Sequence, residues 1–571
     1  MNTSLRVIND FANTGHAGSY FHYSTLTDSF EEWLASGKLE EVIGGQLVNP
    51  ENARVVTINK VPGMQEEMEA AAAQRLVDRK AAMSEEEIEQ TVAATREYNE
   101  WTVAVSAVSM INEVNVLTVE ELPEELRTSQ VTVTDRNGVR YADSVVENDE
   151  LVDISLYFRA DWVPVDQLQR YGEVAQLLGQ VRTGSHTVNE LTVLRNEYGI
   201  TFTAECLTDG ADSSVFIPVL TAKISCLRED TAEAIALVQE IMSDTQFDEY
   251  DTIRYLGLSL TNTMKLYPSI LPHYLIRGIA LAAADSYGLY NYYMGDLPYF
   301  AYLDRLVAMD DAAMAEEGTA LKALLDGLYN REGLKVTVVS DAEGIQNAEA
   351  LLDTMSGTMP YSARNTVSYA EEMEKLPKNI AVKITGSSCY NIKLASMSEI
   401  GYSYTPELDI LDSLVYDQIL IPTLRYRNGV YSTLSSVDES SVYILAYRDP
   451  SPTKTYDEVI PTIAEQISGM TVDEAALNNL IISGYTALAQ QSGPITTAQN
   501  AAKDVLCNTS SQQVKLRRMH AYKGLTPEKL LSFAGIYDAL SEEGVTVTAA
   551  PSSVIDAHAD RYDLVITWYL N

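Results

Sequence analysis

Two side chains in residues 424–432, LRYRNGVYS, could bind a carbonyl oxygen together: Arg425 and Tyr431. A guanidinium and a phenol hydroxyl both donate hydrogen bonds, and such donors strengthen as negative charge develops on the acceptor. Six residues apart, the two would stand roughly 20 Å apart on a strand, and on a helix they would point in different directions. The Asn428-Gly429 pair predicts a break in the chain that lets them converge.

The residues alone leave two interpretations of this pair open. In the first, the turn exists to converge two donors on one oxygen-rich ligand. In the second, Arg425 is an ordinary surface or ion-paired residue and Tyr431 is an ordinary sheet residue.

No complete catalytic or metal-binding motif is present elsewhere in the sequence. We find no H-E-x-x-H, H-x-x-E-H or G-x-S-x-G motif, no phosphate-binding loop and no G-x-G-x-x-G. His16 and His22 are close in sequence, but no carboxylate pattern supports a metal site there, so packing explains them better. Cys389 could act as a nucleophile, but no histidine is paired with it, so it is better interpreted as a small buried residue at a strand end. The chain is therefore expected to hold no catalytic residue, no metal and no cofactor.

The composition is that of a folded globular protein with a strongly acidic balance. The 571 residues are 46% hydrophobic and 21% charged, and the net charge is -41. Nucleic acids and anionic membranes are recognised by basic patches, so neither is an expected partner. A cationic partner would be attracted, although the charge could serve solubility alone.

The cysteines indicate a reducing compartment, because they are scattered and form no C-x-x-C pair. We also see no signal peptide and no apolar segment long enough to cross a membrane. A cytoplasmic location is the resulting expectation. The four cysteines are Cys206, Cys226, Cys389 and Cys507.

The pattern of apolar residues predicts helices first and a mixed helix and sheet region after them. Residues 64–101 read as two helices joined near Met83-Ser84, where Ser84 and Glu87 form a capping box. Strands are expected at 152–158, 222–226, 334–339, 380–384, 442–447, 545–548 and 564–569, with helices between them. A helix capped by Thr526 should end before Gly544.

Two further clusters allow more than one interpretation. The aromatic run at 287–302 is explained by core and interdomain packing, although hydroxyl-bearing aromatic residues can also line a wet peptide-binding cavity. The acidic residues at 244–251 lack the glycine and terminal glutamate of a calcium loop, and we interpret them as a solvated helix start. The aromatic residues are Tyr287, Tyr290, Tyr292, Tyr293, Tyr299, Phe300 and Tyr302, and the acidic ones are Asp244, Asp248, Glu249 and Asp251.

Several segments, taken in order, resemble the C-terminal half of the presequence-protease branch of the pitrilysin/insulinase-type zinc metallopeptidases. The 424–432 stretch is similar to that family's helix ending in Arg, glycine-containing turn and strand bearing a Tyr six residues later. SVYILAYRDPSPTKTYD resembles its strand ending in Y-R-D-P, YYMGDLPYFAYL its Q-M-G-G-x-x-Y-x-x-F-L segment, and LYNREGLKVTVVSD its F-N-R-x-N-L strand entry. The helices at 64–101 look like its linker between two halves. The sequence departs from the family at residues 428–432, where N-G-V-Y-S stands in place of the usual G-G-A-Y-G.

The resemblance implies an α+β fold of α/β sandwich type. It implies the tail of a preceding peptidase domain at 1–60, a helical hairpin linker at 61–114, and two related pitrilysin-type α/β domains at 115–345 and 346–571. The family's zinc ligands lie on an H-x-x-E-H motif in another domain, and this chain holds none of them. In the family, the residues matching Arg425 and Tyr431 bind substrate backbone.

The function implied is that of a non-catalytic C-terminal half. It would close the degradation chamber of a zinc-dependent oligopeptidase and bind the backbone of unfolded peptides. Its partner would be a catalytic half carrying H-x-x-E-H and the zinc, on the same precursor or a separate chain. The alternative is a stand-alone pseudopeptidase that binds peptides or proteins without catalysis.

Overall fold

The structure is a computed structural model of the chain, and it falls into two units, residues 1–115 and 116–571. It describes residues 7–9, 11–13, 15, 23–48, 53–54, 56–57, 59, 61, 63–105, 118–122, 129–147, 150–209, 212–488, 493–507 and 511–567. None of the helices within these ranges combines the length and the apolar character that a membrane span requires. His16 and His22, which are close in sequence, lie outside the described residues.

The first unit is helical. Ser84 and Glu87 cap α5 as expected, because the backbone N–H of Ser84 donates to the Glu87 carboxylate at 2.8 Å and the N–H of Glu87 donates to Ser84 Oγ at 3.2 Å. Most described side chains of α4 and α5 are exposed, including Met68, Leu76 and Val92. The two helices therefore do not form a core of their own. The elements are α2 (Tyr23–Ala35), α3 (Lys38–Val42), η2 (Ile43–Leu47), α4 (Met64–Ala82) and α5 (Glu85–Val105).

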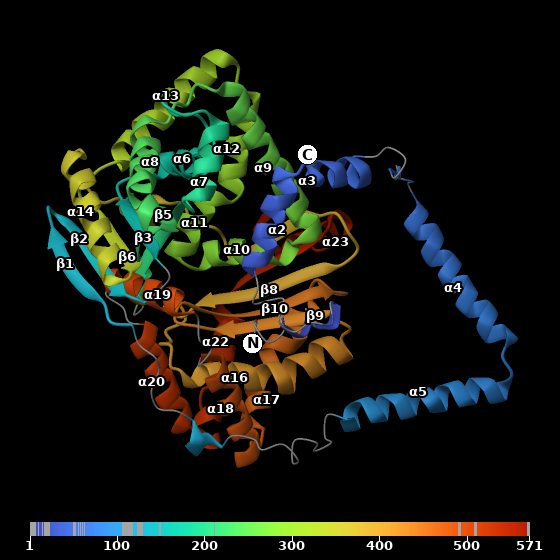
Figure 1. Ribbon diagram of the computed structural model, residues 1–571. Coiled ribbons are helices and arrows are strands. Elements are labelled where there is room, and N and C mark those ends of the chain that lie inside the picture. Colours follow the sequence, from blue (N-terminus) through green and yellow to red (C-terminus); the bar gives the residue numbers. More distant parts are fainter. Residues whose placement is uncertain are drawn as a thin grey trace. The chain divides into compact units, whose positions relative to one another are not determined.

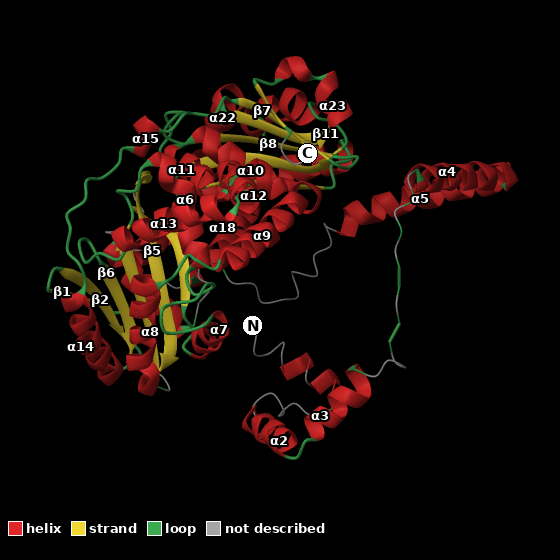
Figure 2. Ribbon diagram, turned by 90° about the horizontal axis from the view of Figure 1, so that it is seen from above, coloured by secondary structure: helices red, strands yellow, loops and turns green. Residues whose placement is uncertain are grey.

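The second unit contains two mixed six-stranded sheets, which confirms the expected α+β class (Figure 2). The first sheet has the order β1-β2-β6-β3-β5-β4 and the second β12-β7-β11-β8-β10-β9. The first is built from β1 (Thr132–Arg136), β2 (Val139–Val145), β3 (Leu151–Arg159), β4 (Thr201–Asp209), β5 (Asp212–Leu227) and β6 (Lys335–Ser340). The second is built from β7 (Asn379–Ile384), β8 (Cys389–Ser396), β9 (Ser432–Val437), β10 (Ser441–Asp449), β11 (Val545–Pro551) and β12 (Leu564–Ile566).

The two sheets share one topology over five strands. In the first, β2 and β6 are parallel, and β3, β5 and β4 follow in antiparallel pairs. In the second, β7 and β11 are parallel, and β8, β10 and β9 follow in the same way. The β9–β10 hairpin of the second sheet is therefore the counterpart of the β4–β5 hairpin of the first.

Each sheet is covered on one face by a helix that comes from the other sheet's part of the chain. Helix α10 (Pro272–Ala284) precedes the second sheet in sequence, yet it packs on β8 and β11 of that sheet (Figure 1). Helix α19 (Pro494–Leu506) follows the first β-strands of the second sheet, yet it packs on β2 and β6 of the first. This exchange fixes the two sheets relative to each other.

The remaining helices pack on the sheets or on other helices. Beside the first sheet lie α6 (Leu168–Leu177), α7 (Val188–Glu197), α8 (Thr231–Asp244), α9 (Tyr250–Ile270), α11 (Ser286–Gly295), α12 (Leu297–Ala308), α13 (Asp311–Leu328) and α14 (Ala342–Thr358). The later part holds α15 (Tyr369–Glu372), α16 (Glu407–Val415), η8 (Tyr416–Arg427), α17 (Ile463–Ser468), α18 (Glu474–Leu488), α20 (Ser511–Lys523), α21 (Pro527–Leu531), α22 (Gly535–Glu543) and α23 (Ser552–Ala557). The expected boundary at 345/346 falls inside α14, which packs on the first sheet.

Some aromatic residues of the run at 287–302 pack in the core, and others line a cavity. Tyr290, Tyr299 and Tyr302 are buried in the core, which is the packing role. Tyr287 and Tyr292 are only partly buried, and both line a cavity between α10, α11 and the β9–β10 turn. The run therefore supplies both core and cavity wall.

One buried carboxyl in this core has no cationic partner among the described residues. Glu173 on α6 is 2% exposed and accepts a hydrogen bond from Tyr299 Oη at 2.7 Å. Burial raises the pKa of Glu173 to about 7, because the charged form is poorly solvated there. Its neighbour Glu317 differs, since Arg170 Nε donates to it at 2.6 Å.

Replacing Glu173 should therefore change the pH dependence of stability. The pKa of Glu173 is higher in the folded protein than in the unfolded one, so its protonated carboxyl stabilises the fold at pH values below the unfolded pKa. This stabilisation is lost as the pH rises through about 7. Glu173→Gln stays neutral, so its Tm relative to wild type should rise by about 2 to 4 °C or more between pH 5 and pH 8. Differential scanning fluorimetry measures this. The exposed Glu316→Gln should give the same small Tm change at both pH values, and an equally flat response of Glu173→Gln would contradict the expectation.

Candidate functional site

The turn between η8 and β9 holds the two residues expected to bind a ligand. Arg425 lies in the last turn of η8, a π-helical segment that contains Pro422. Because proline donates no backbone N–H, it interrupts the regular helical ladder. Gly429 then adopts φ 76°, a left-handed conformation that glycine reaches without strain, and Val430 N donates to Leu424 O at 2.9 Å. The predicted break is present and closed by this bond.

Arg425 and Tyr431 are both exposed, but no hydrogen bond or ring contact joins them within the described part of the chain. Tyr431, which is 62% exposed, has a different guanidinium beside it. Cζ of Arg448 lies 5.5 Å from the centroid of its ring, and Tyr431 N donates to Arg448 O at 3.4 Å. The convergence of Arg425 and Tyr431 on one ligand stays a prediction, and Arg448 is a donor that the sequence interpretation did not include.

Tyr431 belongs to a group of side chains that we call the Tyr447 cluster: Tyr431, Tyr447, Tyr390, His273 and Arg448. The ring centroid of Tyr447 lies 6.0 Å from that of Tyr431, 5.2 Å from Tyr390 and 4.9 Å from His273. Arg448 lies 5.6 Å from the same ring, within cation–π range. The cluster thus joins β8, β10 and the residue before β9 to the first turn of α10.

A β-bulge directs Arg448 toward this cluster. The pairing of β10 with β8 shifts between Tyr447 and Asp449, and Arg448 adopts φ 53°. Such a conformation is strained for a non-glycine residue and persists where its surroundings hold it. The next residue, Asp449, is buried and accepts hydrogen bonds from Asn391 Nδ2 at 2.8 Å and Thr455 Oγ1 at 2.6 Å. Asp449 anchors the bulge.

The cluster presents hydrogen-bond donors and no carboxylate. A hydrogen bond with Tyr390 raises the pKa of Arg448, which therefore stays charged. Burial lowers the pKa of His273, and its Nδ1 has no hydrogen-bond partner among the described residues. A cation and phenol hydroxyls beside a neutral imidazole suit a ligand rich in carbonyl oxygens.

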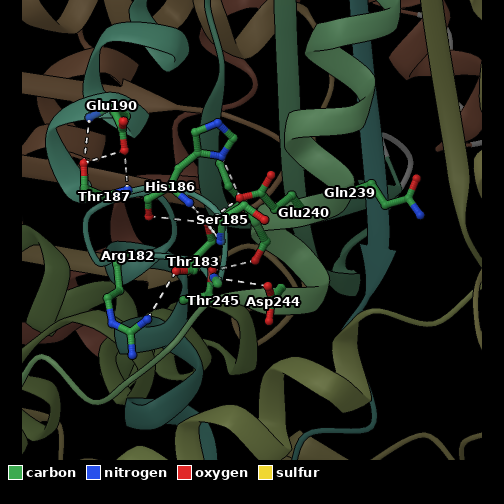
Figure 3. Close-up of polar contacts among 12 residues, drawn as sticks. Arg182, Thr183, Ser185, His186, Thr187, Glu190, Gln239, Glu240, Asp244 and Thr245 are labelled. Atoms are coloured by element: carbon green, nitrogen blue, oxygen red, sulfur yellow. Dashed lines mark hydrogen bonds and ion pairs between the residues drawn. The ribbon is translucent and has the colours of Figure 1, made fainter.

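A second polar network, on the first sheet's helices, contains a hydroxyl, a carboxylate and an imidazole (Figure 3). Glu240 on α8 accepts a hydrogen bond from the hydroxyl of Thr183, and His186 Nδ1 lies 2.8 Å from its Oε1. The backbone N–H of His186 in turn donates to Thr183 Oγ1 at 2.9 Å. Because the hydroxyl bonds the carboxylate rather than the imidazole, it is not an activated nucleophile. The network holds the loop before α7 against α8.

The same loop corrects the interpretation of the acidic residues that follow α8. They are not merely a solvated helix start. Asp244 Oδ2 accepts the N–H of Gly184 at 3.1 Å, and Glu249 accepts the N–H of Arg182 at 2.8 Å, while the Arg182 guanidinium pairs with Asp248. Asp244, Asp248 and Glu249 thus bind the loop, whereas the exposed Asp251 pairs with Arg254. Within the described ranges, no group of three or more His, Cys, Asp or Glu side chains is arranged to hold a metal ion.

The fold and the site thus define a two-sheet α+β chain with an exposed donor cluster. Residues 60–306 match the family model described as associated with peptidase family M16, subfamily C. Protein HypA of Clostridium perfringens is 20% identical over 98% of this chain and 57% of its own length. A mitochondrial presequence protease of Drosophila melanogaster is 17% identical over 59% of this chain and 33% of its own length.

A solved structure shows the same fold. The crystal structure of the peptidase M16 inactive domain from Pseudomonas fluorescens superposes with a TM-score of 0.51 at 14% identity, covering 74% of this chain and 98% of that one. The chain spans 57% of the length of Protein HypA and 33% of the length of the presequence protease. The chain is thus similar to peptidase M16 and presequence-protease relatives, and it has the fold of the solved M16 domain.

If the loop before α7 is held by Glu240, then Glu240→Ala should destabilise the protein. The change leaves the Thr183 hydroxyl and the His186 ring without their shared acceptor, and each lost bond to a charged group costs about 1.5 to 3 kcal/mol. Chemical denaturation should show a loss of that order. The adjacent Gln239→Ala, which removes only a weak 3.5 Å side-chain bond to Thr358, is the matched control. Equal stability of the two variants would contradict the assignment.

Proposed function

We propose that the chain binds the backbone of unfolded peptides as the non-catalytic half of a zinc-dependent oligopeptidase. A second half carrying H-x-x-E-H supplies the zinc, and the two halves close a chamber around the peptide. The observation that carries the proposal is the exposed donor set at the η8–β9 turn. Tyr431 stands there 62% exposed, with the guanidinium of Arg448 beside its ring and Arg425 on the preceding helical turn.

The chemistry of these donors supports backbone binding. A peptide in extended form offers a carbonyl oxygen at each residue, and charged donors hold such acceptors more strongly than neutral ones do. A donor that reaches the scissile carbonyl binds best when its oxygen carries negative charge, which lowers the barrier to hydrolysis. In this proposal the zinc and its activated water belong to the other half, on the H-x-x-E-H motif that the sequence of this chain lacks.

The proposal predicts that donor-removing variants lower activity when the chain is paired with its catalytic half. Arg425→Ala, Tyr431→Phe and Arg448→Ala should each reduce kcat/KM roughly ten- to a thousandfold, about 1.4 to 4 kcal/mol of transition-state stabilisation. Steady-state cleavage of a fluorogenic unfolded peptide measures the effect. A donor that acts only as the oxyanion forms lowers kcat, and one that holds the ground state raises KM.

Arg427→Ala is the matched control, because Arg427 is also exposed and lies in the same helical turn. It should leave kcat/KM within about twofold. Small and equal effects of all four variants, with an unchanged Tm, would show that the η8–β9 turn is ordinary surface. Tight binding of unfolded peptide by this chain alone, with no partner carrying H-x-x-E-H co-purifying from the source cell, would instead establish the stand-alone binding module.

A further inference from the structure

A row of side chains links the Tyr447 cluster to a cavity at the other end of α10. His273, Arg277 and Leu281 recur at every fourth position of α10, each turned by only about 40° from the one before, and Asp285 directly follows the helix. His273 contacts Tyr447 of β10, and the Arg277 guanidinium lies 5.2 Å from the ring of Tyr443, further toward the start of that strand. The row therefore runs alongside β10 as far as the β9–β10 turn.

The cavity at the end of this row has a volume of 340 Å³, within the range of small-ligand pockets. It lies between α10, α11, the start of α12 and the β9–β10 turn. Its charged and polar lining includes one guanidinium and three carboxylates. The residues are Arg277, Asp285, Tyr292, Asp296, Asp438 and Ser441.

Glycines create the space. A Cβ at Gly278 would lie 3.2 Å from Asp296 Oδ2, and a Cβ at Gly288 would lie 2.4 Å from the backbone of Leu281. The first glycine lets the Asp296 carboxylate lie over α10, and the second lets α10 and α11 approach closely. A side chain at either position would fill or distort the cavity.

Asp296 differs from the other two carboxylates of the cavity. Asp285 accepts the N–H of Gly288 at 2.6 Å, and Asp438 Oδ1 accepts the N–H groups of Ser440 and Ser441 at 2.8 and 2.9 Å, so both hold turns. Asp296 is bonded only to the N–H of Leu297 among the described residues. Burial raises the pKa of Asp296 to about 7, because the charged form is poorly solvated there.

We propose that this cavity binds the basic side chain of a peptide, with Asp296 as the counter-ion of its ammonium or guanidinium group. The inference rests on the proposed peptide-binding function and adds a side-chain specificity to it. A cationic group that enters gains the Asp296 carboxylate and the hydroxyls of the walls. The single guanidinium of the lining, Arg277, lies against Tyr443 at the exposed face of α10, so the net charge of the lining stays negative.

The geometry also sets the spacing along the peptide. From His273 to Asp285 the axis of α10 advances about 18 Å, at about 1.5 Å per residue. An extended peptide covers that distance in about five to six residues, at about 3.3 Å each. The basic residue should therefore lie about five or six positions from the residue whose carbonyl is held at Tyr431.

The first test uses the wild-type chain and labelled ten-residue peptides of Ala, Ser and Gly that carry one Lys or one norleucine. Fluorescence anisotropy should give the Lys peptide a Kd at least about tenfold lower, the scale of one charge-assisted bond. The preference should increase from pH 6 to pH 8, because Asp296 ionises near 7 while Lys stays charged.

Other titratable and charged groups face Asp296 across the cavity. They are Arg277 and Asp285 from α10 and its end, Tyr287 and Tyr292 from α11, and Asp438 from the β9–β10 turn. Burial raises the pKa values of Tyr287 and Tyr292 above the range tested. Asp285 also has a pKa raised by burial, and its ionisation acts in the same direction as that of Asp296.

Asp296→Asn removes the counter-ion and should abolish both the Lys preference and its pH dependence. Gly278→Ala, which crowds the carboxylate without changing a charge, should reduce the preference severalfold. Asp304→Asn is the matched control: it lies on the same helix as the cavity's edge, is half-exposed, and pairs with Lys265 outside the cavity. It should bind like wild type.

The outcomes separate this inference from the proposed function. Equal binding of the Lys and norleucine peptides by wild type would overturn the cavity assignment and leave the peptide-binding proposal intact. Binding of free butylammonium with the same Asp296 dependence, but of neither peptide, would establish a small-amine site and overturn both. If Asp296→Asn fails to fold, the binding of the Lys and norleucine peptides by the wild-type chain, and the pH dependence of that binding, still test the cavity assignment.

Discussion

The exchange of helices between the two sheets is the interaction on which the rest of the second unit depends. Leu275, Ile276 and Ile279 of α10 are buried in one cluster with Ile392 and Leu394 of the second sheet. Each fully buried aliphatic side chain contributes about 1.5 to 3 kcal/mol relative to exposure. Helix α19 makes the reciprocal contact with the first sheet through Ala502 and Leu506. Neither sheet could lose this cover without exposing an apolar face.

The same helix positions both parts of the proposed binding surface. The first turn of α10 brings His273 to the Tyr447 cluster, and its last turn forms one wall of the cavity. The apolar side of α10 is fixed by the second sheet, and its polar row contacts Tyr447 and Tyr443 of β10. The burial that stabilises the two-sheet arrangement thus also sets the distance between the donors at Tyr431 and the carboxylate at Asp296.

Many regular parts of this fold could be predicted from the sequence, whereas several of the breaks between them were missed. Strand β3 alternates apolar residues on one face, and α8 buries Ile235, Val238 and Ile241 as its spacing predicts. The prediction missed β1 and β2, although Asn137-Gly138 between them is a strong hairpin signal, and both residues adopt positive φ. The single helix expected before Gly544 is two, α21 and α22. Such breaks depend on tertiary packing, which local patterns do not record.

The candidate site shows where that limit lies. The glycine of the Asn428-Gly429 pair takes positive φ as expected, whereas Asn428 stays right-handed at φ -95°. The sequence motif Y-R-D-P contains Arg448, but nothing in its spacing reveals a bulge that turns this side chain toward Tyr431. The role of His273 depends on a helix distant in sequence.

The charge differs between the two ends of that helix, α10. The guanidinium of Arg448 lies near its first turn, and the carboxylates of Asp285, Asp296 and Asp438 lie at the other end. With a net charge of -41, the whole chain attracts basic peptides at long range. Within about one Debye length, roughly 8 Å, the local charges decide the final placement. If the surface binds peptide as proposed, a basic side chain would be repelled at the Arg448 end and attracted at the Asp296 end, which would favour one register.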